Sequence, residues 1–398
     1  MEKIELLAPA GDLERLKIAI MYGADAVFVG GKRFSLRSRA SNFTIEDITE
    51  GVEFAKEYGA KIHVTVNMLP HDEDFEGLKE YILALDKAGV YAVICASLHI
   101  AKKVIEMKTN MEVHLSTQQS SLNTLTTQFY KELGVDRVVL GRELEMSEIK
   151  NISKNSNIEI EAFIHGGMCS NYSGRCTLSN FMTFRDANRG GCAQSCRWKY
   201  HVLENGQEIS DSQVLFSMSS KDLMAAKFIP QLIQANVSSL KIEGRMKSLY
   251  YIATVVRGYR HLIDYYYQNT SISENKMQYF IDEITRAENR PVDIGFYKGR
   301  PDESGHLYQQ RSERVTHDFL GKVLKVKENK VLVEVRNKFQ NGDVIEFFGP
   351  ELKTYKLEFN YAISNKEEEK LEVCNVPMQQ VWIETSYDLK ENYLIRKG

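Results

Sequence analysis

Between residues 4 and 245 the chain repeats one pattern, in which a short apolar run is followed by a turn and then by an amphipathic stretch. The apolar runs span 4–9, 26–31, 61–68, 92–97, 112–117, 137–142, 158–166 and 239–245. Helical spacing of apolar positions fills the segments between them, as in 12–21, 45–58, 74–88, 98–108 and 122–133. Because strands that alternate with helices pair in parallel through right-handed crossovers, this pattern predicts an α/β architecture.

The number of repeats favours a closed barrel over an open sheet. Eight strand–helix units, spread over roughly the 250 residues typical of the fold, predict a (β/α)8 TIM-like barrel. The rival architecture is a doubly wound open sheet, but no GxGxxG motif follows the first apolar run. In a barrel, the carboxyl ends of the strands form the functional face.

Two segments depart from the repeat. About seventy residues, 167–238, separate the seventh and eighth strands, and a connection of this length in a compact domain usually carries function. From residue 318 onward, apolar and polar positions alternate with period two between turn signals, as in an antiparallel sheet. We therefore predict a barrel domain over 1–289, a Pro- and Gly-containing linker over 290–317 and a small β-barrel domain over 318–398.

Composition and charge add limits to this picture. The chain has 398 residues and a net charge of −3, so no overall basic field indicates nucleic acid, although a local basic surface is compatible with this value. The longest apolar runs are far shorter than a membrane span, and no signal peptide pattern opens the sequence. We expect a cytoplasmic protein without membrane contact, in which thiols stay reduced.

Four of the six cysteines lie at the start of the long connection, at Cys169, Cys176, Cys192 and Cys196. Structural zinc sites usually contain Cys-x2-Cys pairs, and none of these gaps is two residues. Iron–sulfur clusters also take four thiolates and accept wider spacings. The spacing favours an iron–sulfur cluster, with zinc, redox thiols or buried cysteines as alternatives.

Polar residues at the strand ends supply candidates for binding and catalysis. Lys241, Glu243 and Arg245 alternate along the eighth strand, so that all three face one side. They could clamp a carboxylate or phosphate, or form an internal network of ion pairs. Further candidates for binding are Asn67 and Arg142, and those for catalysis are His165, Glu161 and Glu243.

Cations surround the cysteines and alternate with aromatic residues. They are Arg175, Arg185, Arg189, Arg197 and Lys199, interleaved with Tyr172, Phe181, Phe184, Trp198 and Tyr200. Cations that meet phosphates and rings that stack on unpaired bases are typical of an RNA-binding surface. We therefore include Arg175 and Arg197 among the candidate substrate-binding residues. The alternative is a set of solvated loop charges.

Three stretches carry a resemblance to a known family. "LLAPAGDLERLKIAIMYGADAVFVGG", "FIHGGMCSNYSGRC" with the cysteine block that follows it, and "SLKIEGRMKS" resemble peptidase family U32, the collagenase-like proteases. The resemblance covers nearly the whole chain and is strongest to the branch of tRNA hydroxylation proteins. It implies a 4Fe-4S cluster held by four cysteines, with Cys169, Cys176 and Cys192 at family positions and Cys196 as the nearby fourth ligand. It also implies tRNA as partner and prephenate-dependent 5-hydroxylation of the wobble uridine.

Three functions follow as hypotheses. The first is an RNA-modifying hydroxylase that uses prephenate as co-substrate. The second is a U32-type peptidase, for which His165 and Cys169 would form a catalytic pair, although the chain has neither HExxH nor GxSxG. The third is a non-catalytic, metal-stabilised protein that assembles with another family member or with a second copy of itself.

Overall fold

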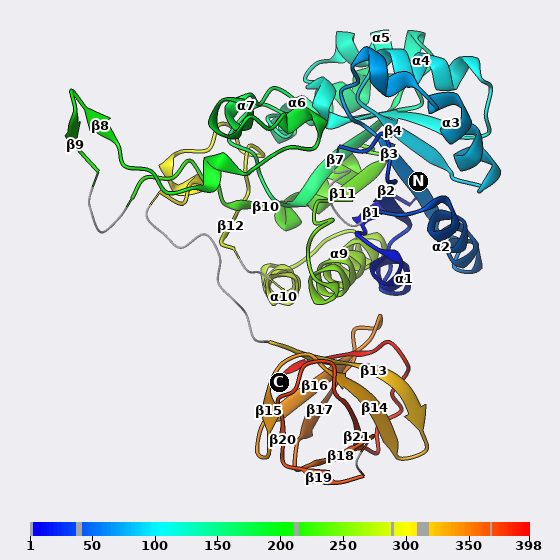
Figure 1. Cartoon of the computed structure of the whole chain (residues 1–398), viewed down its shortest axis with the longest axis vertical. Coiled ribbons are helices and arrows are strands. Elements are labelled where there is room, and N and C mark those ends of the chain that lie inside the picture. The colour runs from blue at the N-terminus through cyan, green and yellow to red at the C-terminus, as the bar shows by residue number, and fades with distance from the viewer. Residues whose placement is uncertain (1–2, 37–41, 211–214, 288–289, 309–317, 367) are drawn as a thin grey trace.

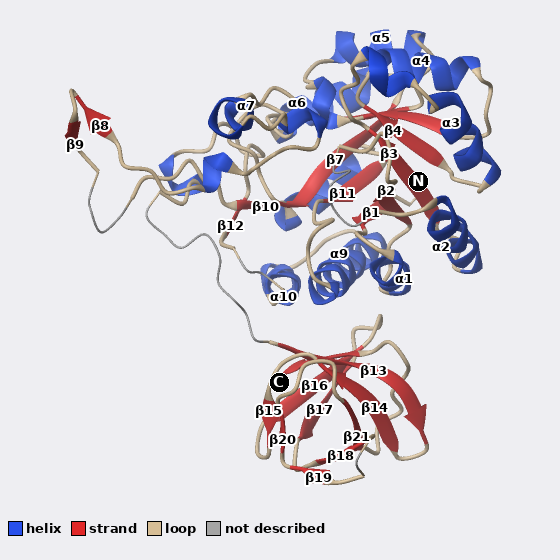
Figure 2. Cartoon of the chain, in the orientation of Figure 1, coloured by secondary structure: helices blue, strands red, loops and turns tan. Residues whose placement is uncertain are grey.

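The computed structural model describes residues 3–36, 42–210, 215–287, 290–308, 318–366 and 368–398. An α/β domain occupies the upper part of Figure 1, and the C-terminal strands form a second body below it. Helices surround the strands of the first domain, whereas the second consists of strands and loops (Figure 2). Among the residues described, no helix is both long and apolar enough to cross a bilayer.

Eight parallel strands close into a barrel, which confirms the predicted fold. They are β1 (Glu5–Pro9), β2 (Ala26–Gly30), β3 (Lys61–Val66), β4 (Ala92–Cys95), β5 (Glu112–Leu115), β6 (Arg137–Val139), β7 (Glu159–Gly166) and β11 (Ser239–Ile242). Each strand pairs with its neighbour in this order, and β11 pairs in parallel with both β1 and β7. Ser239, for example, is opposite Glu5 on one side and Glu161 on the other. This closure excludes the open doubly wound sheet.

The barrel helices begin where the sequence places capping residues. They are α1 (Leu13–Met21), α2 (Ile45–Glu57), α3 (Leu78–Lys87), α4 (Leu98–Glu106), α5 (Thr124–Glu132), α6 (Met146–Asn155), α8 (Ile229–Gln234), α9 (Leu249–Asn269) and α10 (Glu274–Thr285). At Asp12, Thr44 and Ser248, the side chain accepts a hydrogen bond from a backbone N–H of the first helical turn. Such caps satisfy donors that a helix start leaves unpaired, and they fix where each strand-to-helix loop ends.

The connection between β7 and β11 forms a layer of its own. It contains α7 (Leu178–Thr183), the short helices η3 (Ala187–Arg189) and η4 (Ser195–Arg197), the hairpin β8–β9 (Leu203–Glu204 and Gln207–Glu208) and β10 (Asp222–Met224). The hairpin projects away from the domain at the left of Figure 1. β10 runs antiparallel to the end of β7, so the connection returns to the barrel before α8.

The segment expected to be a linker begins as part of the barrel domain. β12 (Val292–Asp293) pairs with β10, and Arg290 and Leu307 are buried. The burial of Arg290 has a clear cause, because its guanidinium donates to Asp222 on β10 over 2.8 Å. Residues 309–317 of the expected linker lie outside the described residues.

The C-terminal domain is an antiparallel sheet, as the period-two pattern predicted. Its strands are β13 (Phe319–Lys327), β14 (Lys330–Val335), β16 (Val344–Phe348), β17 (Thr354–Glu358), β18 (Ala362–Ser364), β19 (Lys370–Leu371), β21 (Gln380–Glu384) and β22 (Leu394–Lys397). The spatial order is β17-β16-β22-β13-β14-β21-β18-β19, with a separate pair formed by β15 (Phe339–Gln340) and β20 (Val373–Cys374). The curved sheet encloses its own apolar core, with Val333 and Phe347 fully buried.

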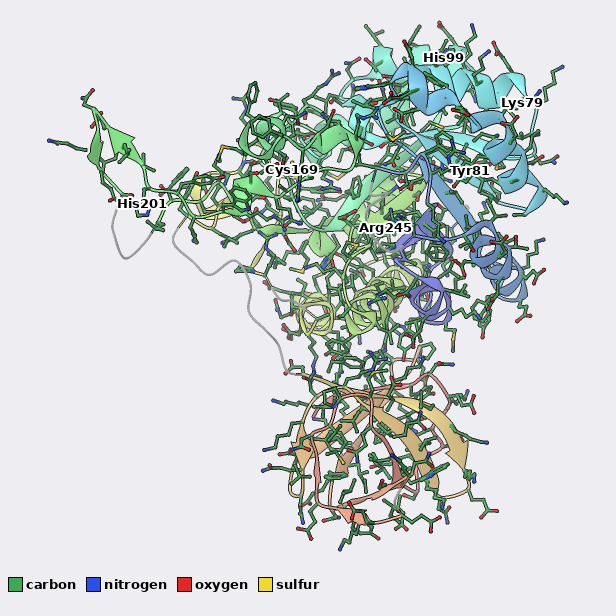
Figure 3. All side chains as sticks on the ribbon, viewed as in Figure 1. Lys79, Tyr81, His99, Cys169, His201 and Arg245 are labelled. Carbon is green, nitrogen blue, oxygen red and sulfur yellow. The ribbon has the colours of Figure 1, made fainter. Side chains whose placement is uncertain are left out.

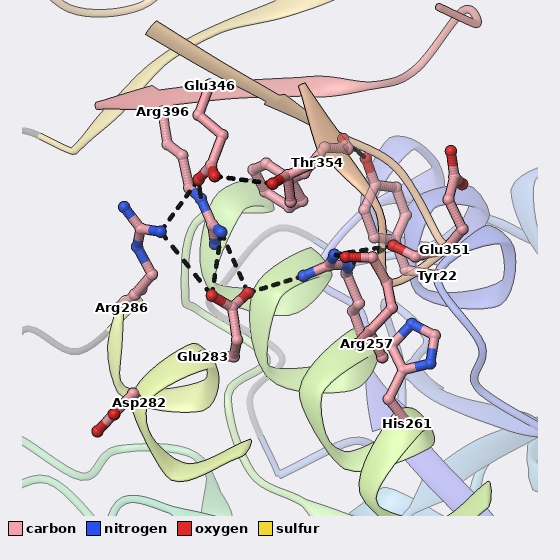
Figure 4. A network of polar contacts seen from close by, with 12 residues as sticks. Tyr22, Arg257, His261, Asp282, Glu283, Arg286, Glu346, Glu351, Thr354 and Arg396 are labelled. Carbon is pink, nitrogen blue, oxygen red and sulfur yellow. Dashed lines mark hydrogen bonds and ion pairs between the residues drawn. The ribbon is translucent and has the colours of Figure 1, made fainter. Parts of the chain in front are cut away.

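The two domains meet through buried ion pairs and apolar contacts. Arg396 of β22 binds Glu346 of β16 over 2.6 Å and Glu283 of α10 over 3.1 Å (Figure 4). Phe348 and Leu394 belong to the same core cluster as α9. Because the C-terminal domain packs on α9 and α10, it lies on the helical flank of the barrel.

Candidate functional site

A cavity of about 460 Å³ opens at the carboxyl ends of the barrel strands. Its lower wall is formed by barrel residues, which include Phe28, Thr65, Ile94, Phe163 and Lys241. Residues of the cysteine-bearing connection close its upper side. Cys169 lines the cavity from that connection and Arg245 from the barrel, and both are labelled in Figure 3. The functional face that the barrel fold predicts is therefore a lined, concave site.

The floor of the cavity is held by buried charges. Lys241 Nζ lies 2.7 Å from Glu161 Oε1, and Arg137 approaches the other Glu161 oxygen at 3.4 Å. Burial alone would raise the pKa of Glu161, but Lys241 and Arg137 outweigh it, so the pKa lies below its usual value. Arg137 also binds Glu5 over 2.5 Å. Lys241 thus faces the cavity as a cation whose counter-charge lies beneath it.

Cations dominate the rim. Arg245 donates to Ser35 over 3.1 Å and to Asn42. Arg142 donates to the Gly167 carbonyl over 2.5 Å, and its guanidinium lies 3.8 Å from the centroid of the Phe163 ring. Among the described residues, the charged lining side chains are Arg142, Arg197, Lys241, Arg245, Lys247 and Arg290, with Asp222 and Glu243 as the acidic members. A cavity with this balance suits an anionic ligand that carries a carboxylate or phosphate group.

The cysteine connection is fastened across the barrel mouth at two points. On one side Arg189 pairs with Asp74, and its guanidinium also donates to the Leu69 carbonyl over 3.1 Å. On the other, Glu143 accepts from the backbone N–H of Ser173 over 2.9 Å. Gly174 has a φ of 76°, and a Cβ there would lie 2.1 Å from the Gln118 carbonyl oxygen. Only glycine permits this close approach, so the loop is fitted to the end of the barrel.

Three of the four predicted thiol ligands face the same cavity. Cys169, Cys192 and Cys196 line it, whereas Cys176 Sγ accepts a hydrogen bond from Asn171 over 3.4 Å. Desolvation raises the pKa of the Cys169 thiol, and the nearby Cys196 and Cys176 sulfurs act in the same direction. The donor set matches an iron–sulfur centre in kind. Within the part of the chain that the structure describes, however, no three His, Cys, Asp or Glu side chains are placed to hold one metal ion.

The other predicted site residues divide into two groups. Asn67, Arg142, Arg197, Lys241, Glu243 and Arg245 all line the cavity. His165 instead packs behind β7, where its Nδ1 lies 3.3 Å from the Tyr259 hydroxyl of α9. Glu161 is fully buried beneath Lys241, and Arg175 is exposed on the loop, where it donates to Ser120 over 3.4 Å. Of the three catalytic candidates, Glu243 is the one that reaches the cavity.

The placement of His165 bears on the peptidase hypothesis. Its ring packs against Tyr251 and Tyr259, with centroid distances of 5.8 and 5.5 Å, and the side chain is buried. Burial, with a smaller effect of Lys247, lowers its pKa to about 3. Cys169 is exposed on the cavity side. The imidazole therefore faces α9, and the geometry does not form the thiol–imidazole pair that a cysteine peptidase needs.

Sequence reasoning missed several cavity-lining residues, and four of them belong to its network of charged contacts. Asp222 binds Arg290 over 2.8 Å and Lys247 over 3.7 Å, and all three line the cavity. Ser35 lines it too and accepts from Arg245. Lys247 could have been found, because it follows Arg245 in the same basic motif. Arg290 and Asp222 carry no local signal, since they meet only through the pairing of β10 with β12.

Comparison with known proteins gives consistent results over the full length. The sequence profile of peptidase family U32 matches residues 11–307, and that of the peptidase family U32 C-terminal domain matches residues 315–396. The tRNA hydroxylation protein P1 of Bacillus subtilis (strain 168) is 45% identical, over 100% of this chain and 95% of that protein. The tRNA hydroxylation protein P of Helicobacter pylori (strain ATCC 700392 / 26695) is 38% identical, over 76% of this chain and 74% of its own length. A collagenase of Porphyromonas gingivalis (strain ATCC BAA-308 / W83) is 34% identical, over 87% of this chain and 86% of that protein.

Proposed function

We propose that this chain, which belongs to peptidase family U32, is an enzyme that takes part in hydroxylating a nucleobase of RNA. The observation that carries the proposal is the cavity at the barrel mouth, which three cysteine thiols and an excess of cations line together. Relatives named as tRNA hydroxylation proteins support it, because one of them matches the whole chain at 45% identity. In its finer form, the reaction is 5-hydroxylation of the wobble uridine of tRNA with prephenate as co-substrate.

The cavity supports an anionic co-substrate. Prephenate carries two carboxylates, and Lys241 of β11 and Arg245, three residues after that strand ends, both line the cavity. The Arg245 guanidinium is oriented by Ser35 and Asn42, so it is held in place before a ligand arrives. Arg142 and Arg197 also line the cavity. We assign the co-substrate carboxylates to these four cations.

The cofactor in this proposal is a 4Fe-4S cluster with Cys169, Cys176, Cys192 and Cys196 as its ligands. Bound there, it would supply one-electron chemistry at the cavity roof. Three of the four thiols line the cavity and Cys176 does not, and among the described residues they form no closed ligand set, so cluster binding must draw the four sulfurs together. A zinc ion held by the same four thiolates is the alternative, and it would have a structural role because no coordination position stays open.

The chain's own residues contribute binding, orientation and proton transfer. A target base must leave its stack to reach the cavity, where the Phe28 and Phe163 rings provide apolar walls. Glu243 is the carboxylate candidate for proton transfer, because it lines the cavity beside Lys241 and Arg245. The Cys-bearing loop, fastened by Arg189 and Asp74, covers the opening and limits the access of water.

The test is mass spectrometry of tRNA nucleosides from a strain that lacks the gene. Complementation with the native chain should restore 5-hydroxyuridine derivatives, and Cys169→Ala or Cys192→Ala should not. Cys374→Ala is the matched control, because Cys374 is buried in the C-terminal domain away from the cavity. Iron content and absorbance of the anaerobically purified protein distinguish the cluster from zinc. If all four loop cysteines can be replaced without loss of the modification, the proposal fails.

A further inference from the structure

Two phenylalanines of the cysteine connection project into solvent beside the cavity. Phe184 is 98% exposed and Phe181 82% exposed. Phe184 also has a φ of 55°, a left-handed conformation that residues other than glycine rarely adopt. Burying a phenylalanine side chain stabilises a protein by about 1.5–3 kcal/mol, and neither of these two rings contributes that stabilisation in the free protein. Paired exposed rings of this kind indicate a binding surface.

The two rings lie on a segment that also builds the cavity. The backbone N–H of Ala193 donates to Ser179 of α7 over 3.1 Å, and α7 contacts η4. Cys192 and Cys196, on either side of this contact, line the cavity. Figure 1 shows α7 at the edge of the barrel domain that bears the β8–β9 hairpin. The exposed rings therefore lie on the solvent side of the same loop whose cysteines line the cavity.

The charge of this loop selects the class of partner. Residues 169–200 contain five cationic side chains and one carboxylate, although the whole chain has a net charge of −3. The one carboxylate, that of Asp186, is engaged within the loop, because it accepts a hydrogen bond from the backbone N–H of Asn188 over 2.8 Å. Arg175 and Arg185 are exposed on the same loop as the rings. Exposed rings among cations match unpaired nucleotides, since cations attract phosphates and every base presents a face for stacking.

We propose that Phe181 and Phe184 form a stacking platform for the unpaired nucleotides that flank the target base, while the target base itself enters the cavity. This inference rests on the proposed action on RNA, and it assigns the RNA contacts that lie outside the cavity. Stacking of the neighbours on a fixed surface would compensate for the free energy that extruding the target base requires. Arg185, which follows Phe184, would contact the phosphate between two stacked nucleotides.

The test measures RNA binding directly, by fluorescence anisotropy of the purified full-length chain. The probes are a labelled RNA hairpin with an unpaired loop and a fully paired RNA duplex. We expect Phe184→Ala to weaken hairpin binding about tenfold and Phe181→Ala/Phe184→Ala to weaken it further, with duplex binding unchanged. Phe129→Ala is the matched control, because Phe129 is 50% exposed on α5 outside the loop, and it should bind as the native chain does. Arg185→Gln should lower the slope of log Kd against log salt by about 0.7.

The outcomes separate this inference from the proposed function. Hairpin binding that is equal in Phe184→Ala and the native chain overturns the platform, even if tRNA hydroxylation is found in cells. Conversely, Phe184-dependent hairpin binding without any change in tRNA nucleosides supports the platform and refutes the proposed hydroxylation of tRNA. If the Phe181→Ala/Phe184→Ala variant changes the sedimentation coefficient but not RNA binding, the rings join two copies of the chain, and the platform is again overturned.

Discussion

The buried cluster between the two domains gives the sharpest test of the fold. Arg396 is fully buried, with Nε 2.6 Å from Glu346 and its guanidinium 4.7 Å from the Phe348 ring centroid. Arg286 binds the same Glu346 carboxylate over 3.0 Å, but its side chain is 30% exposed (Figure 4). The pair therefore offers two arginines with shared partners and different burial. We predict that Arg396→Met is strongly destabilising and that Arg286→Met is nearly neutral.

The magnitude follows from what each substitution leaves behind. Removing one member of a buried ion pair costs about 3–5 kcal/mol, because the remaining charge is desolvated without compensation. Glu346 keeps Arg286, and Glu283 keeps Arg257 at 2.8 Å, so we expect the lower end, about 3 kcal/mol. The pair of the partly exposed Arg286 with Glu346 is better screened by water and should contribute no more than about 1 kcal/mol. With a urea m-value of about 3 kcal/mol/M, the midpoints should fall by about 1 M and by at most about 0.3 M.

The assay is equilibrium urea unfolding followed by tryptophan fluorescence. Trp382 on β21 reports the C-terminal domain, which Arg396 attaches to α10. Unfolding in high salt provides a second criterion, since ions screen the Arg286 pair and leave the buried Arg396 pair largely unaffected. Equal midpoint shifts for the two variants, or a shift below about 0.3 M for Arg396→Met, would show that burial does not determine the strength of these pairs.

Three further predictions follow from local geometry. A Cβ at Gly166 (φ 105°) would lie 2.2 Å from the Glu243 carbonyl oxygen, so Gly166→Ala should lower the free energy of unfolding by more than about 2 kcal/mol in the same urea assay. Gly59→Ala is the control, because Gly59 has a φ of 67° but no neighbouring atom within 4 Å of the added Cβ, and it should lower the free energy of unfolding by about 1 kcal/mol. Burial lowers the pKa of His165 to about 3, so the unfolded chain binds more protons below about pH 6.5 and stability falls as the pH drops. In urea unfolding measured across this pH range, His165→Phe should flatten the slope by up to about 1.4 kcal/mol per pH unit. Asp74→Asn should weaken the ion pair with Arg189 and speed limited proteolysis within 167–200, without changing the urea midpoint. Glu73→Gln is the control: the Glu73 side chain is 80% exposed, and the substitution should not change the cleavage rate.

The barrel could be predicted because its strands carry their signal locally. Each apolar run is short, bounded by turns and followed by a helical period, and all eight runs contain the observed strands. The signal was weaker where burial depends on a distant partner. Residues 290–308 look like a linker because they contain Pro291, Pro301 and several glycines, yet Arg290 is drawn inside by Asp222, sixty-eight residues earlier in the chain. No local pattern can show such a pairing, since it exists only after β10 has folded back on β7.

The period of two along the eighth strand predicted the direction of three charged side chains but not their partners. It placed Lys241, Glu243 and Arg245 on one face, and all three line the cavity. Lys241 lies within the strand, where Glu161 on the adjacent β7 meets it at 2.7 Å, whereas Arg245 lies beyond the end of the strand and donates to the buried Ser35 hydroxyl. The sequence left a clamp and an internal ion pair as alternatives. The structure shows the ion pair of Lys241 with Glu161, and the clamp remains a proposal. Both side chains are 5% exposed, and each is fixed in position by a buried partner, Lys241 by Glu161 and Arg245 by Ser35. Under the proposed function, both cations would be held in place before the co-substrate binds, which lowers the ordering cost of binding.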